Sequence, residues 1–311
     1  MTNQKEFDEL AGRYRREIHV HCYRMLGSFH EAEDLVQETL LRAWRGRETY
    51  DPSTGPDGFR AWLHRIATNA CLDWLRATPR KVAKSAAEVA WIEPYPDQLL
   101  DEIPASDTPD TVAIKRETIA LGYLRLIQLL SPRQRAALIL RDVLDWSAAE
   151  TAAVLRCSVA ASNSALQRAR ATMLLHADPN RLEPAAAEPN DRERALLAAF
   201  IDAHERADTA ASVALMCEDI EVTMPPRPFR YVGVENLLPL VRGAGEMGEW
   251  RLVPAWANRQ PAAASYLKRP GDSEFRAFKV DVLRVLDGRI REITTFDGRL
   301  VLAFGLPEIL R

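Results

Sequence analysis

Apolar residues recur every three or four positions along the first half of the chain, which is the spacing of helices that bury one face. This pattern predicts helices over residues 7–26, 32–44 and 59–75. Gly27-Ser28 separates the first two, and the Pro- and Gly-rich stretch 51–58 predicts a loop before the third. Three helices of this length, joined by short connections, predict a small helical bundle.

The same period resumes beyond residue 110 and predicts a second helical domain. Helices are expected over 112–130 and 132–141, the second opened by Ser131 as N-cap and by Pro132 at the first helical position. Two more follow over 147–155 and 159–175, separated by a break of three residues. Short helices around a tight turn are typical of a helix-turn-helix.

Near residue 190 the pattern changes from helical spacing to alternation. Helices over 192–207 and 212–216 are followed by five predicted strands, over 220–224, 251–258, 262–268, 274–286 and 289–295. Turns are expected at 270–272 and at Asp287-Gly288. Helices followed by an antiparallel meander predict an α+β domain. The fold class is therefore multi-domain, with two all-α domains before an α+β domain.

Two stretches without periodicity are predicted to be linkers. Residues 79–111 are acidic and Pro-rich, and residues 178–190 are rich in Ala and Pro. The predicted domains are therefore 1–78, 112–177 and 191–311. Within the first linker, residues 91–101 (WIEPYPDQLLD) are too apolar for a simple spacer. We expect them to pack on a domain or to bind a partner.

Charge is distributed unevenly along the chain. The 311 residues carry a net charge of −3, which argues against a protein that coats nucleic acid. By segment, the net charge is 0 over 1–80, −5 over 81–112, +4 over 113–180 and −2 over 181–311. Since local charge governs phosphate contacts, the second helical domain is the better candidate for them.

The cysteines and histidines predict neither disulfides nor a metal site. Four cysteines are scattered singly, which suits a reduced compartment. His19 and His21 lie two residues apart on a predicted helix and so face different ways. The amino terminus has no signal-peptide core and no segment approaches membrane-spanning length. We expect a cytoplasmic protein with no cofactor, no metal and no membrane contact.

The most informative string is residues 31–44, EAEDLVQETLLRAW. Its apolar residues form a core stripe, and another face carries Asp34, Gln37, Glu38 and Leu41. A solvated helix face would explain the charges alone. The full string, however, resembles region 2 of bacterial sigma-70-family factors, specifically the extracytoplasmic-function (ECF) group. That resemblance implies that these four residues contact the clamp helices of the largest subunit of core RNA polymerase.

Residues 59–76, FRAWLHRIATNACLDWLR, resemble the element of the same family that reads the melted −10 promoter sequence. The string Ile66-Ala67-Thr68-Asn69 makes Asn69 the implied contact to a flipped base, while nearby arginines hold phosphate. Tyr50, in the loop 46–57, is expected to form the pocket wall. The implied −10 contacts are Tyr50, Arg60, Arg65, Asn69, Asp73 and Arg76.

Residues 130–142 and 145–155 resemble region 4, which reads the −35 element as duplex while its first helices meet the polymerase flap. In the recognition helix we expect Val159, Leu166 and Met173 to face inward. Ser162 stands where the repeat favours an apolar residue. The implied −35 contacts are Ser158, Ala160, Ala161, Ser164, Gln167, Arg168 and Arg170.

The last domain resembles the SnoaL-like branch of the nuclear-transport-factor-2-like superfamily, a cone of helices around a curved sheet. The supporting phrases are Met224-Pro225-Pro226, 231–234 and 296–300. Relatives of this fold include isomerases and hydrolases, for which Asp281, Asp287 and Asp297 would be the candidates. Five aromatic residues either line a ligand cavity or form ordinary core: Trp250, Trp256, Phe275, Phe278 and Phe296.

These observations predict an ECF sigma factor that binds core RNA polymerase and promoter DNA, is not itself an enzyme, and is modulated by its own SnoaL-like domain. We further expect residues 91–101 to contact that domain and to hold the DNA-binding domains closed. Two alternatives remain open. One is a helix-turn-helix regulator that senses a ligand through the last domain, and the other is a SnoaL-like isomerase or hydrolase.

Overall fold

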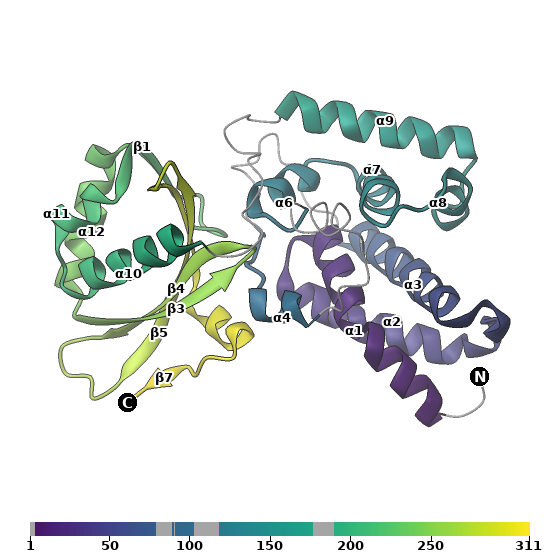
Figure 1. Cartoon of the computed structure of the whole chain (residues 1–311), viewed down its shortest axis with the longest axis horizontal. Coiled ribbons are helices and arrows are strands. Elements are labelled where there is room, and N and C mark those ends of the chain that lie inside the picture. Colours follow the sequence, from purple (N-terminus) through teal and green to yellow (C-terminus); the bar gives the residue numbers. More distant parts are fainter. Residues whose placement is uncertain (1–3, 79–88, 90, 103–117, 177–189) are drawn as a thin grey trace. The chain divides into compact units, whose positions relative to one another are not determined.

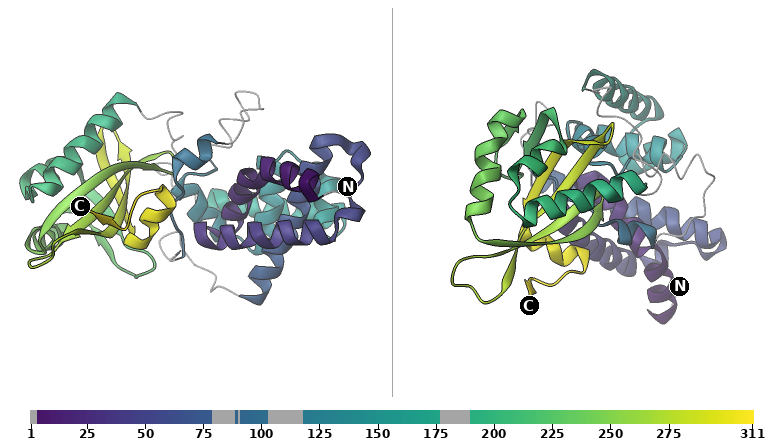
Figure 2. Two further views of the ribbon diagram at one scale, coloured as in Figure 1. Left: turned by 90° about the horizontal axis from the view of Figure 1, so that it is seen from below. Right: turned by 60° about the vertical axis from the view of Figure 1, so that its left-hand side comes forward.

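The computed structural model describes the chain except for residues 1–3, 79–88, 90, 103–117 and 177–189. The chain divides into two compact units (Figures 1 and 2). The amino-terminal unit comprises residues 1–92 and 99–183, and the carboxyl-terminal unit comprises residues 93–98 and 184–311. The multi-domain class is confirmed, because helices fill the first unit and a seven-stranded sheet dominates the second.

The amino-terminal unit begins with the predicted three-helix bundle, α1 (Gln4–Leu26), α2 (Phe29–Arg45) and α3 (Gly55–Ala77). Gly27 turns the chain at a φ of 78°, and the Ser28 hydroxyl accepts the Glu31 amide at 3.3 Å as the N-cap of α2. Two 3₁₀ turns, η1 (Arg47–Thr49) and η2 (Pro52–Thr54), connect α2 to α3. The loop prediction over 51–58 is wrong in its second half, because α3 already begins at Gly55.

The second helical domain contains α6 (Leu121–Gln128), α7 (Pro132–Leu138), α8 (Ala148–Leu155) and α9 (Val159–His176). A π-helical turn, η4 (Ile139–Val143), extends α7. The predicted helix 112–130 is wrong at 118–120, which form a turn that buries Ile119; residues 112–117 lie outside the described residues. The helix-turn-helix is confirmed by α8 and α9, with the Ser147–Glu150 capping box opening α8.

The carboxyl-terminal unit is built on a sheet with strand order β2-β1-β6-β5-β4-β3. The strands are β1 (Met216–Thr223), β2 (Arg230–Val232), β3 (Glu249–Ala257), β4 (Gln260–Lys268), β5 (Phe275–Leu286), β6 (Arg289–Asp297) and β7 (Ile309–Leu310), which pairs with β5. Strands β3 to β6 form the predicted antiparallel meander. β1 joins β6 in parallel, which the meander prediction did not include.

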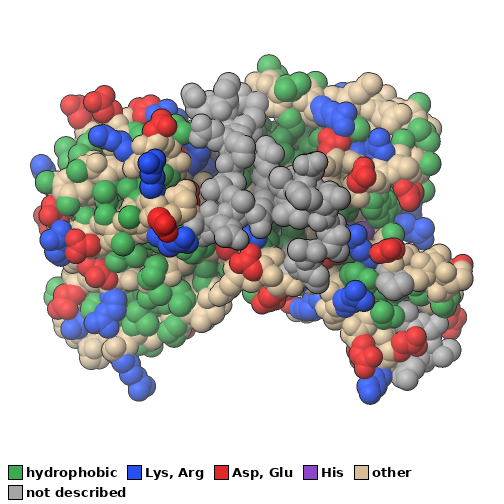
Figure 3. All heavy atoms as spheres, in the orientation of Figure 1, with side chains coloured by type: hydrophobic (Ala, Val, Ile, Leu, Met, Phe, Trp, Pro, Cys, Tyr) green, Lys and Arg blue, Asp and Glu red, His purple; other side chains and the backbone are tan. Residues whose placement is uncertain are grey.

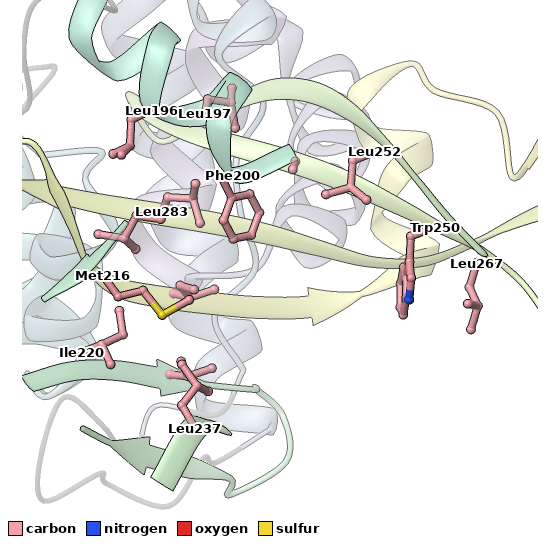
Figure 4. Packing of buried hydrophobic residues seen from close by; sticks show 14 residues of the cluster. Leu196, Leu197, Phe200, Met216, Ile220, Leu237, Trp250, Leu252, Leu267 and Leu283 are labelled. Atoms are coloured by element: carbon pink, nitrogen blue, oxygen red, sulfur yellow. The ribbon is translucent and has the colours of Figure 1, made fainter. Parts of the chain in front are cut away.

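The helices of this unit are α10 (Asp191–Glu205), α11 (Thr209–Ala214) and α12 (Val234–Glu246), followed after β6 by η5 (Gly298–Phe304). α10 crosses strands β3 and β4 (Figure 1). Leu197, Phe200, Leu252 and Leu283 meet in the core beneath it (Figure 4). α12 was not predicted from the sequence, because Pro239 within it and two glycines near its end obscure the helical pattern.

The five aromatic residues considered as a cavity lining do not form one group. Trp250, Trp256 and Phe278 belong to the core cluster, with Trp250 and Phe278 in edge contact at 5.3 Å. The Phe275 ring instead lies under the Arg251 guanidinium at 4.5 Å. Phe296 is 3% exposed, so packing accounts for four of the five, and Phe275 pairs with Arg251 instead. Over the face of this unit seen in Figure 3, basic and acidic side chains are interspersed.

Among the described residues, no helix is both long enough and apolar enough to cross a membrane.

Candidate polymerase and promoter interface

The predicted polymerase face of α2 is exposed at its centre. Asp34, Gln37 and Leu41 are all exposed, and Leu41 keeps 42% of its surface although it is a large apolar residue. Leu35 and Val36 between them are buried and hold the helix on the bundle. An exposed leucine beside a carboxylate and an amide offers both apolar area and polar groups to a partner protein.

Glu38, the fourth residue of that face, begins a chain of ion pairs that leads to α3. Its carboxylate lies 2.7 Å from Arg42 Nε, and Arg42 Nη1 lies 2.9 Å from Asp73 Oδ2. Arg76 approaches the other Asp73 oxygen at 3.1 Å. The Arg42 guanidinium lowers the pKa of Asp73. Arg42 therefore connects the two predicted faces, a role that its position in the sequence alone did not indicate.

α3 presents most of the predicted −10 residues on one side. Arg65 and Arg76 are exposed, and Asn69 is half-buried with its amide donating to the Arg65 carbonyl at 2.8 Å. Asn69, Asp73 and Arg76 line one cavity together. The structure thus brings these residues together on one side of α3.

Arg60 and Tyr50 lie elsewhere. The Arg60 guanidinium is 2.5 Å from Glu17 of α1, and nine residues of helix place it about 180° from Asn69 around α3. Tyr50 donates to the Gly55 carbonyl at 2.9 Å and packs against Phe59 and Trp62. Trp62, which was not among the predicted −10 contacts, lines a second cavity beside Asn69.

The histidines of α1 are structural in this bundle. His21 is buried beside His64, and its Nε2 lies 2.9 Å from the Thr68 hydroxyl. Burial lowers the pKa of His21, and it lowers the pKa of His19 to about 3. No group of three metal-ligating side chains occurs within the described part of the chain. These histidines are therefore neutral packing residues at pH 7.

The recognition helix α9 exposes the predicted −35 residues. Ser158, Ala160, Ala161, Gln167, Arg168 and Arg170 are exposed, and Ser164 is half-buried. Asn163, which was not predicted, is exposed on the same face. Arg170 pairs with Asp142 of η4 at 2.6 Å, so its guanidinium is held against its own domain. Its side chain would have to exchange this partner to bind phosphate.

The inner face of α9 differs from the prediction at one position. Leu166 is buried and Met173 is half-buried, as expected, but Val159 is 44% exposed. Val159 is the first residue of α9, where a side chain lies beyond the edge of the partner helices. Ser162 is 1% exposed and occupies the inward position.

The predicted carboxylates of the carboxyl-terminal unit fall into two kinds. Asp287 lies in a hairpin turn at a φ of 51°, and Asp297 caps η5. Asp281 is fully buried, accepts the Thr295 hydroxyl at 2.6 Å and lies 2.7 Å from Lys279 Nζ. Burial and the Lys279 charge lower the pKa of nearby His204 to about 4. Of the three candidate carboxylates, only Asp281 is buried, and Thr295 and Lys279 hold it in place.

Residues Glu93–Gln98, which we call the strap, are part of the carboxyl-terminal unit although they precede the second helical domain in sequence. The Tyr95 amide donates to Asn258 Oδ1 at 2.8 Å, and the Asn258 amide donates to the Tyr95 carbonyl at 2.9 Å. The Arg259 amide donates to Asp97 at 2.9 Å. The predicted contact of this linker with the last domain is observed for these residues.

The receptor for the strap is the turn between β3 and β4. Asn258 and Arg259 have φ values of 55° and 60°, the left-handed pair of a two-residue hairpin turn. Their amides therefore project from the sheet edge toward the strap, which also forms a bridge between Pro96 and Ala257. At the other end of the strap, Gln98 donates to the Phe304 carbonyl at 2.7 Å.

Comparisons with known proteins identify the helical domains. Residues 10–81 match the family Sigma-70 region 2, and residues 121–173 match Sigma-70, region 4. The chain is 41% identical over 316 residues to the ECF RNA polymerase sigma factor SigG of Mycobacterium tuberculosis, covering 96% of this chain and 83% of that protein. It is 29% identical over 298 residues to SigJ of the same species, covering 90% and 84%.

The crystal structure of SigJ aligns with a TM-score of 0.58 at 21% identity, over 95% of this chain and 96% of that one. This likeness spans both units and shows a shared fold. The resemblance inferred from residues 31–44 and 59–76 is confirmed by these matches.

Proposed function

The chain belongs to the ECF group of RNA polymerase sigma factors, and on that premise we propose that its carboxyl-terminal unit regulates the promoter-binding domains through the strap. As a sigma factor, the protein binds RNA polymerase and directs it to promoters; its family is one of initiation factors rather than enzymes. Its site of action is then the cytoplasm, with the polymerase.

Three helices carry the recognition roles in this proposal. α2 contacts the clamp helices through Asp34, Gln37, Glu38 and Leu41, and the exposure of Asp34, Gln37 and Leu41 supports the assignment. α3 holds the melted −10 strand around Asn69, and α9 reads −35 duplex with Ser164 and Gln167. The helices before α8 meet the polymerase flap. α6 and α7 also contact the end of α1, and we expect these contacts to regulate DNA binding by the two domains.

The two helical domains are locked together by a buried polar network. Arg135 of α7 is 4% exposed, and its guanidinium donates to the Met25 carbonyl at the end of α1 and to Gln128 Oε1. Gln128 in turn donates to the Arg24 carbonyl at 3.2 Å. Last-turn carbonyls lack partners within their own helix, so these donors stabilise the end of α1 from the other domain.

We call the form in which this network joins the two helical domains the closed form. In it, the protein cannot bind both promoter elements at once. The −35 and −10 elements are about 25 base pairs apart by their names, which is roughly 85 Å of duplex at 3.4 Å per base pair. In the closed form, Asn69 of α3 and Leu155 of α8 line one cavity. The two domains must therefore separate before they bind the elements together.

The strap follows closely in sequence after Trp91, a residue that contacts the network joining the two helical domains. Trp91 Nε1 donates to Gln128 Oε1 at 3.3 Å, and Trp91 lies two residues before the strap begins. A carboxyl-terminal unit that holds residues 93–98 restrains the chain next to Trp91. The single observation that carries the proposal is the pairing of Tyr95 with Asn258, because it connects the regulatory unit to this linker.

The test is a pair of substitutions in the turn that receives the strap. Asn258→Gly keeps the left-handed backbone but removes the acceptor for the Tyr95 amide, whereas Asn258→Asp keeps an acceptor oxygen. We expect Asn258→Gly to raise transcription several-fold with core polymerase, on a promoter selected from a library, and Asn258→Asp to resemble the parent.

Truncation after Asn190 serves as the second measurement, since it removes the receptor altogether. Promoter activity of the truncated chain should rise at least as much as that of Asn258→Gly. Equal activity of the parent, the glycine variant and the truncated chain would contradict the regulatory role and leave the sigma-factor assignment intact.

A further inference from the structure

Two adjoining cavities of the amino-terminal unit lie between α3 and α8. Their volumes are about 420 and 450 Å³, and both are lined by Asn69 and Arg156. The first extends toward Arg76 and Arg133, and the second toward Trp62 and Arg65. Together they form a cleft, here called the α3–α8 cleft, of the size that small-molecule ligands occupy.

The lining of the cleft is strongly basic in a chain whose net charge is −3. Five arginines and a single carboxylate line it: Arg42, Arg65, Arg76, Arg133, Arg156 and Asp73. Arg42 and Arg76 are both engaged by Asp73. Within the described residues, the guanidinium groups of Arg65, Arg133 and Arg156 have no ion pair. Like charges gathered in this way repel each other unless an anion joins them.

The backbone conformation of Arg156 is the clearest indication that the arginines of the cleft bind a ligand. It ends α8 in the left-handed conformation, with a φ of 50° and a ψ of 53°, where glycine is the usual residue. A non-glycine residue there costs about 1 kcal/mol. Arg156 nevertheless occupies this position. Its guanidinium, which has no ion pair within the described residues, lies between the two cavities.

The second cavity adds features that recognise a base. Trp62 is half-buried, held by the rings of Tyr50 and Phe59 at 5.5 and 5.6 Å, and contributes to the cavity wall. A fixed aromatic face stacks on any base, and the neighbouring Asn69 amide offers both donors and an acceptor. A base stacked on Trp62 would lie beside Arg65 and Arg156, and these arginines would bind the phosphate groups attached to it.

We propose that the α3–α8 cleft binds a nucleoside polyphosphate, with its base against Trp62 and its phosphates on Arg65, Arg156 and Arg133. The site includes residues from both helical domains, so it exists only while they are closed. A ligand of this kind favours the closed form by mass action. The inference extends the proposed regulation, since the ligand would act on the same equilibrium as the strap.

The test measures binding to the full-length protein without polymerase or promoter, by titration calorimetry with ATP, adenosine and inorganic tripolyphosphate. We expect one ATP per chain and much weaker binding of the two partial ligands. Arg156→Gly should weaken ATP binding about tenfold or more. Glycine suits the left-handed position, so this variant should fold at least as well as the parent. Arg192→Ala, an exposed arginine of α10, is the matched control and should bind ATP normally.

Several results would overturn the proposal. These are the absence of ATP binding at millimolar concentration, equal binding by the Arg156→Gly and Arg192→Ala variants, and equal affinity for ATP and tripolyphosphate. Tighter binding of a short single-stranded oligonucleotide than of ATP would also overturn it, in favour of a plain DNA-binding face. None of these results depends on promoter activity, so they are distinguishable from a failure of the strap proposal.

Discussion

Asp73 of α3 and Asp281 of β5 each contact two side chains, yet their surroundings differ completely. The Asp73 side chain is 49% exposed beside Arg42 and Arg76, and the Asp281 side chain is 1% exposed beside Lys279 and Thr295. An exposed pair is screened by water and can exchange partners at little cost, whereas a buried pair cannot. The comparison separates an exposed carboxylate that can exchange its partners from a buried one that is part of the core.

The largest expected effect is on the buried carboxylate. Asp281→Ala leaves the Lys279 ammonium without its partner in a poorly hydrated site, so we expect a loss of about 3–5 kcal/mol from the stability of the carboxyl-terminal unit. Hydrogen exchange of the β5 and β6 amides measures this loss. Asp73→Ala, the matched exposed variant, should change the stability of its unit by less than about 1 kcal/mol. Similar losses at both positions would refute the distinction.

The stability of the carboxyl-terminal unit should depend on pH because of His204. Its pKa is about 4 in the folded chain, against 6.5 in the unfolded one, so the unfolded chain binds the proton more tightly. Stability should therefore fall as the pH decreases from 6.5 to 4, by up to about 3 kcal/mol. His204→Gln should flatten this slope in the exchange of β3 and β5 amides. His176→Gln, at an exposed histidine, should leave it unchanged; a slope insensitive to both would remove His204 as its cause.

The exposed polymerase face should show the opposite profile, with a large effect on binding and little on stability. Asp34→Ala with Gln37→Ala removes two side chains that are exposed and make no core contact, so we expect affinity for core RNA polymerase to fall about tenfold or more. Fluorescence anisotropy with purified core measures the change. Glu9→Ala, an exposed carboxylate of α1, is the control. Unchanged affinity of the double variant would exclude this face as the contact.

The sequence was most informative where a function depends on one helix. The α2 and α3 strings carry both their core stripe and their exposed residues within about 20 positions, so local spacing predicted which side chains share a face. Arg60 was nominated by the resemblance alone, since helical spacing already places it about 180° from Asn69, and its pairing with Glu17 of another helix agrees. Arg42 contacts Asp73 of another helix, and Trp62 contacts Tyr50 of the segment before its own helix. Spacing within one helix does not identify such neighbours.

The sheet unit was less predictable because its contacts join distant positions. The parallel pairing of β1 with β6 has no local pattern, and α12 is hidden by Pro239. The strap was expected to dock, from its apolar composition, but nothing in it specifies Asn258 as its partner. That residue lies 163 positions away and was selected by the hairpin geometry of β3 and β4.

That separation also has a consequence in time. A ribosome adding about 5–20 residues per second needs roughly 8–30 s to pass from Tyr95 to Asn258, which are 163 positions apart. During this interval both helical domains leave the ribosome and can fold before the turn that receives the strap has been synthesised. If the strap regulates the helical domains as proposed, each new molecule is unrestrained until the turn at Asn258 has been synthesised.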